Sequence, residues 1–127
     1  MLRKALAFFS LLMLGLSAAS AHASTSNKWR LQFSGGSHSA GEIVIELTPV
    51  GADAIVVTIP VPDHESENGV AKHVVEVLRA KLPEDGFHVE RDDGEDVLIK
   101  KRHGAADFGL RIVSNSVKHV HINLDRE

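Results

Sequence analysis

The sequence predicts an α+β domain with a mainly antiparallel, twisted sheet of about six to seven strands and one central helix packed on one face. Two observations predict this class. Short segments carry apolar residues at every second position, and a single stretch between residues 66 and 82 has helical periodicity instead. The expected order of elements is β-β-β-α-β-β-β-β.

Three strand candidates precede the helix. In the first two, residues 29–33 and 43–47, apolar and polar residues alternate, which is typical of strands with one buried face. A loop rich in glycine and serine, residues 34–41, separates them. The third candidate, residues 55–61, is apolar on both faces and is therefore expected to be a central strand. Pro60 and a second proline two positions later are expected to end it, because proline cannot donate to the ladder.

The helix is predicted over residues 66–82, where valine, alanine and leucine form one apolar stripe. Ser66 is suited to cap its first turn, and basic residues near the last turn suit the negative end of the helix dipole. Pro83 is expected to stop it. The connection through the helix also permits the strands on either side to lie parallel, with a right-handed crossover.

Four strand candidates follow the helix, over residues 87–90, 97–99, 108–112 and 120–124. Residues 92–95 contain two aspartates and a glycine, which predicts a tight hairpin turn between the first two of these strands.

The first 23 residues have the three parts of a secretory signal peptide. Basic residues follow Met1, an apolar run covers residues 5–16, and a small-residue site ends at Ala23. The run is shorter than the roughly 20 apolar residues that span a bilayer, so no membrane anchor is expected in the mature chain. Cleavage near Ala23 leaves a single small α+β domain, residues 24–127, in the periplasm or the external medium.

Composition excludes several classes of function. Removing 2 basic residues with the signal peptide changes 14 Lys+Arg into 12, against 17 Asp+Glu, so the mature chain has a formal net charge of −5. An acidic domain is a poor partner for nucleic acid, which needs a basic surface. The chain has no cysteine, which excludes disulfides, thiolate metal sites and a lipid anchor on cysteine.

Histidine is the one unusual residue type, with 8 in the full chain. His119 and His121 are two positions apart, which on a strand places both imidazoles on one face with Val120 buried opposite. His88 and Glu90 are expected to point outward in the same way. If the two strands are neighbours, these four side chains are candidate ligands for zinc, copper or nickel. The alternative is that they populate the solvated face of a sheet.

No enzyme motif is present. Ser37 and His38 could be combined with an acid into a hydrolase triad, but the G-x-S-x-G motif of such enzymes is absent. We therefore expect a non-enzymatic domain without a cofactor. The leading hypothesis is an exported binding or accessory domain whose sheet edge or polar sheet face contacts another envelope or extracellular protein. The alternative is a periplasmic protein that binds a divalent metal through histidine.

Overall fold

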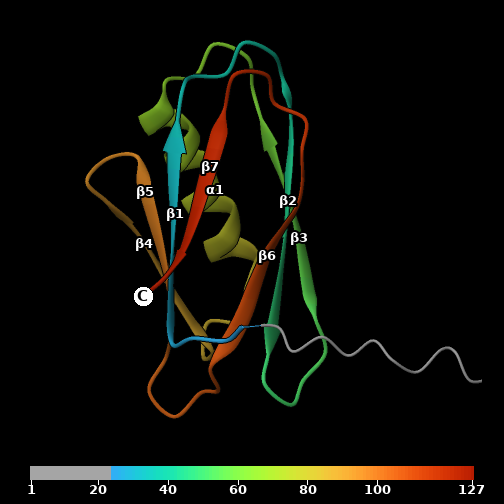
Figure 1. Ribbon diagram of the computed structural model, residues 1–127, viewed down its shortest axis with the longest axis vertical. Coiled ribbons are helices and arrows are strands. Elements are labelled where there is room, and N and C mark those ends of the chain that lie inside the picture. The colour runs from blue at the N-terminus through green and yellow to red at the C-terminus, as the bar shows by residue number, and fades with distance from the viewer. Residues whose placement is uncertain (1–23) are drawn as a thin grey trace, which may run out of the picture.

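The computed structural model describes residues 24–127, so the predicted signal peptide lies outside the described residues. Seven strands and one helix follow in the predicted order (Figure 1). They are β1 (Lys28–Ser34), β2 (Gly41–Pro49), β3 (Ile55–Val61), α1 (Glu67–Lys81), β4 (Phe87–Asp92), β5 (Asp96–Lys101), β6 (Phe108–Asn115) and β7 (His121–Arg126).

The strands form two antiparallel sheets. One has the order β4-β5-β1-β7 and the other β3-β2-β6. The α+β class and the antiparallel pairing are thus confirmed, but the expectation of one sheet is wrong. The difference arises in the loop over residues 35–40, which carries the chain from β1 in one sheet to β2 in the other. Strands β3 and β4 also lie in different sheets, so the parallel arrangement permitted by the sequence does not occur.

The helix joins the two sheets on one side. It packs against β3 of the three-stranded sheet and against β1, β4 and β5 of the four-stranded sheet (Figure 1). Its start is as predicted, since Ser66 is the N-cap and its hydroxyl accepts a hydrogen bond of 3.0 Å from the Gly69 N–H. Between residues 24 and 127, no helix is long and apolar enough to cross a membrane.

The prediction that β3 is a central strand is wrong, because β3 is an edge strand of its sheet. Val56, on its outward face, is 58% exposed. Pro60 lies inside β3 and does not end it, contrary to the prediction. Proline has no N–H to donate, and an edge strand tolerates it because one side of such a strand forms no ladder hydrogen bonds.

A single apolar core lies between the two sheets and the helix. The alternating residues of β1 and β2 that the sequence assigns to the buried face are buried. Trp29 is 6% exposed, and its indole N–H donates to the carbonyl of Phe108 at 2.8 Å, which links β1 to the start of β6. Burial with a satisfied indole is the usual state of a core tryptophan.

The hairpin between β4 and β5 is confirmed. Asp93 and Gly94 have φ angles of 49° and 79°, the left-handed conformation that tight hairpin turns require.

Candidate functional site

His119 and His121 lie at the end of the molecule where β6 connects to β7. Val120 between them is buried, as predicted. His119, however, is not on a strand, because β7 begins at His121 and His119 occupies the preceding turn with a φ of 74°. The two rings are nevertheless near each other, with centroids 6.3 Å apart.

His88 and Glu90 point outward from β4, as predicted, and Glu90 contacts both His88 and Lys100. The His88 Nε2 lies 3.5 Å from one Glu90 oxygen, and the Lys100 ammonium lies 2.6 Å from the other. The hydrogen bond and charge of Lys100 lower the pKa of Glu90. This carboxylate is therefore engaged by a lysine on the neighbouring strand, as in an ordinary surface ion pair.

The structure does not bring the four predicted ligands together. β4 and β7 are the opposite edges of the four-stranded sheet, separated by β5 and β1. The condition for a joint site, that these two strands be neighbours, is therefore not met. In the part of the chain that the structure describes, no three histidine or acidic side chains are arranged to hold a metal.

The acidic residues of the β4–β5 hairpin have a structural partner. The guanidinium of Arg30 on β1 lies 2.6 Å from Asp96, 3.1 Å from Asp92 and 2.8 Å from the carboxylate of Glu127. Hydrogen bonds to Glu127 and Asp96 raise the pKa of Arg30, and Arg30 in turn lowers the pKa of Glu127. The network ties together β1, the hairpin and the C-terminus.

Ser37 does not form a catalytic pair with His38. Its side chain is buried, and its hydroxyl donates to the carbonyl of Pro62 at 2.7 Å while accepting from the Glu65 N–H at 2.7 Å. The hydroxyl thus connects two loops, and both of its hydrogen-bonding roles are used.

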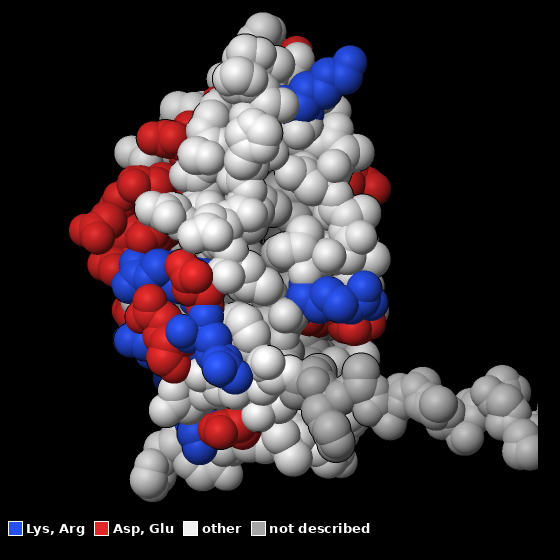
Figure 2. Space-filling model, viewed as in Figure 1, with Lys and Arg blue, Asp and Glu red and all other residues white. Residues whose placement is uncertain are grey.

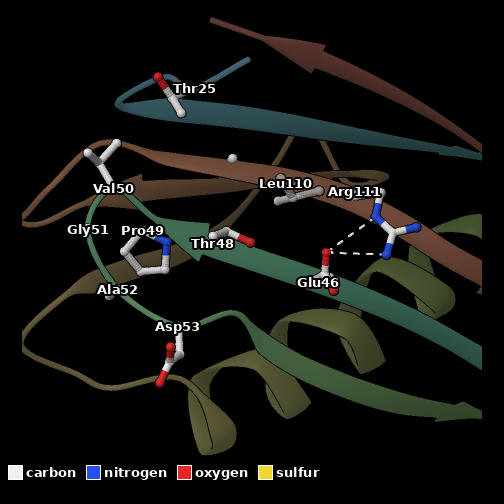
Figure 3. Close-up of a pocket in the computed structure, with 11 residues that line it drawn as sticks. Thr25, Glu46, Thr48, Pro49, Val50, Gly51, Ala52, Asp53, Leu110 and Arg111 are labelled. Carbon is white, nitrogen blue, oxygen red and sulfur yellow. Dashed lines mark hydrogen bonds and ion pairs between the residues drawn. The ribbon is translucent and has the colours of Figure 1, made fainter. Parts of the chain in front are cut away.

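A cavity of about 440 Å³ opens on the outer face of the three-stranded sheet (Figure 3). Figure 3 shows the ion pair between Glu46 and Arg111 at one end, with the Arg111 Nε 3.3 Å from Glu46, and the β2–β3 turn at the other. The walls are mainly apolar. The lining residues are Thr25, Glu46, Thr48, Pro49, Val50, Gly51, Ala52, Asp53, Gly109, Leu110 and Arg111.

The large apolar side chains that are exposed in residues 24–127 all belong to this sheet or its β2–β3 turn. Val50 in the β2–β3 turn, Val56 on β3 and Val113 on β6 are 59%, 58% and 42% exposed. Figure 2 shows the charged side chains of this view gathered on the side where β4 and β5 lie in Figure 1, with fewer of them on the side of β2 and β3. The alternation in the sequence does not reveal this surface, because a lone valine on an outward position is common and carries no signal by itself.

The chain matches no protein-family model, no curated protein and no solved structure. Function must therefore be argued from its surfaces and side chains, since a fold class shared by many activities does not identify one.

Proposed function

We propose that this protein is a small exported accessory domain, without catalytic activity, that binds an extended segment of another envelope or extracellular protein along β6. The observation that carries the proposal is the arrangement of the strand edges. Among residues 24–127, β3, β4, β6 and β7 are the edge strands, each paired with one other strand (Figure 1). The helix packs against β3 and β4, whereas β6 and β7 lie away from it. A one-sided strand presents N–H and C=O groups that can add a further strand.

The chain itself already uses this side of β6. Ser26 forms an isolated antiparallel bridge with Phe108, and each donates its N–H to the other's carbonyl at 3.0 Å. Because backbone groups in an antiparallel ladder alternate in direction, Leu110 presents its N–H and C=O toward the same side as Phe108. A partner strand that continues from Ser26 along β6 would pair with these groups.

The surroundings of β6 can supply selectivity. Thr25 and Gly109, one residue beyond the bridge on each strand, both line the cavity on the outer face. A side chain of an added strand that points outward would therefore lie next to an apolar cavity of about 440 Å³ with an ion pair at its border. Added strands gain affinity from main-chain bonds and specificity from such side-chain pockets.

Replacing Val113 by lysine is expected to weaken strand addition at least tenfold, because a lysine beside an open edge disfavours pairing. The probe is a short extended peptide selected on the purified mature domain from a random phage-displayed library, and its Kd is measured by calorimetry. Val56→Lys is the matched control, since Val56 is also an exposed valine of this sheet but lies on β3, which β2 separates from β6. Both variants should keep the stability of the parent within about 0.5 kcal/mol.

A second arm tests the mode of binding. N-methylation at alternate residues of the peptide should abolish binding in one register and spare it in the other, because only one set of N–H groups faces β6. Peptides that bind equally to Val113→Lys, or that tolerate methylation in both registers, would contradict the proposal.

Export is tested separately. When the full chain is produced in a bacterial host, the exported protein should begin at Ser24, as shown by intact mass and N-terminal sequencing. Replacing Ala23 by arginine should leave the precursor unprocessed, since the cleavage site requires a small residue. Recovery of the uncleaved chain in the cytoplasm, with Ala23 intact, would show that residues 1–23 do not direct export.

A further inference from the structure

A second cavity, of about 310 Å³, lies where the end of α1 meets β4 and the loop after β5. It shares no lining residue with the cavity of Figure 3. Three basic side chains line it, and they come from three different segments of the chain. They are Arg79 on α1, His88 on β4 and Arg102 after β5. The sequence separates these residues, so this basic cavity in an acidic domain is visible only in the structure.

The backbone around Arg102 is firmly held. The N–H groups of Gly86 and Phe87 both donate to the Pro83 carbonyl at 3.2 Å, which closes the turn between α1 and β4. The Arg102 N–H donates to the Gly86 carbonyl at 2.9 Å, and its Nε donates to the Glu84 carbonyl at 2.9 Å. The guanidinium of Arg102 is therefore attached to this turn by its own side chain and by its main chain.

Arg79 is oriented in the same way from the opposite wall. A basic residue in the last turn of a helix suits the helix dipole, but the Arg79 Nε donates to a strand, to the Val89 carbonyl at 2.9 Å. A guanidinium has five N–H donors, so a bond through Nε fixes the group and leaves its terminal Nη groups available. None of the ion pairs in residues 24–127 includes Arg79 or Arg102.

The charge of the lining suits an anion with a single charge. Glu84 is the one acidic residue among those that line the cavity. Two arginines against one glutamate leave a formal charge of +1, with histidine counted as neutral. A ligand with two negative charges would place its second charge beside the Glu84 carboxylate, which repels it. The remaining walls are apolar and buried, and they include Leu82 and Phe87.

We propose that this cavity binds a small organic monocarboxylate. Its two oxygens accept hydrogen bonds from the Nη groups of Arg79 and Arg102, because a planar guanidinium matches the geometry of a carboxylate. Its apolar part contacts Leu82 and Phe87. The volume lies at the lower end of the range for ligand cavities, about 300–1,000 Å³, so the ligand is compact. This site does not depend on the proposed binding of a strand to β6.

Calorimetric titration of the purified mature protein with sodium hexanoate tests the proposal. We expect one site per chain with a Kd below about 1 mM. Acetate, which lacks the apolar part, and hexanol, which lacks the carboxylate, should each bind at least about tenfold more weakly. Arg79→Gln and Arg102→Lys should also weaken hexanoate binding at least about tenfold, the second because an ammonium group cannot form the planar fork.

Glu84→Gln tests the role of the charge. The substitution keeps the main-chain carbonyl that accepts from Arg102 and removes the only carboxylate of the lining. Inorganic phosphate should therefore bind at least about tenfold more tightly to this variant than to the parent, whereas its affinity for hexanoate should not fall. A purely structural role of the two arginines predicts no such change in specificity.

Arg91→Gln is the matched control, because Arg91 is an exposed arginine of β4 that does not line the cavity. It should bind hexanoate as the parent does, and urea denaturation should show that all variants are folded. In NMR spectra, hexanoate should shift the resonances of Leu82 and Phe87. Unchanged binding in Arg79→Gln or Arg102→Lys, or an equal loss in Arg91→Gln, would overturn the proposal. The absence of saturable binding of hexanoate up to about 10 mM would do the same.

Discussion

Replacing Arg30 by methionine is expected to lower the free energy of unfolding by about 3 kcal/mol at pH 7, the range seen when one partner of a buried ion pair is removed. The Asp96 side chain is only 8% exposed and lies 2.6 Å from the guanidinium. One of its oxygens, Oδ1, has no hydrogen-bond partner. Without Arg30, this carboxylate would remain in a poorly solvated position beside Asp92 and Glu127, with no cation to compensate it.

The loss should depend on pH in a defined direction. Arg30 lowers the pKa of Glu127 in the folded state, so this pair contributes stability above the unfolded pKa of about 4.3. The contribution disappears as the pH falls through the folded pKa. The difference between parent and Arg30→Met should therefore be complete at pH 7 and should shrink as the solution is acidified below about pH 4. Urea denaturation at a series of pH values measures it.

Arg111→Met is the matched control. Arg111 also pairs with a glutamate, Glu46, but its side chain is 62% exposed and the distance is 3.3 Å. Exposed pairs contribute about 0–1 kcal/mol, so this variant should lose little stability. If both arginine variants lose the same amount, the buried position of Asp96 has no energetic consequence and the interpretation of the network is wrong.

The local structure of the chain could be predicted from its sequence because each element depends on nearby residues. The helix follows from its apolar stripe and its Ser66 cap, and the β4–β5 hairpin follows from Gly94. Burial of Val120 follows from strand alternation. These signals act over a few residues, within the reach of periodicity and turn chemistry.

The division into two sheets could not be predicted, since pairing partners are chosen by contacts between distant segments. The run of apolar residues in β3 indicated a central strand, but its burial comes from α1 on one face, and Val56 on the other is exposed. Periodicity cannot distinguish a strand covered by a helix from one covered by two neighbouring strands.

The candidate sites were accessible from the sequence only in part. The His119–His121 spacing was visible, but the left-handed turn at His119 and the stack on His38 depend on loops that meet in space. The position of β6 at the edge of its sheet likewise depends on which strands pair, and the alternation in the sequence does not determine that. The role of Arg30 could not be predicted, because the three carboxylates that contact it lie far away in the sequence, at residues 92, 96 and 127.

Replacing Ser37 by alanine is the second change with a large expected effect, a loss of about 3 kcal/mol in the free energy of unfolding. The Ser37 hydroxyl satisfies the Pro62 carbonyl and the Glu65 N–H at once, and the residue is 2% exposed. Removing it leaves two polar groups without a partner where water has little access, at about 1–3 kcal/mol each. Chemical denaturation of the purified mature variant measures the loss.

Ser116→Ala separates burial from hydrogen bonding. The Ser116 hydroxyl also accepts from a backbone N–H, that of Glu42 at 2.9 Å, but it is exposed, so water replaces it and the loss should stay below about 1 kcal/mol. Equal losses in the two variants would contradict the role given to burial.

Because Ser37 precedes His38 and anchors it to the β3–α1 loop, its removal should also loosen the His38–His119 stack. Ser37 is thus expected to be among the least replaceable residues of the glycine- and serine-rich loop.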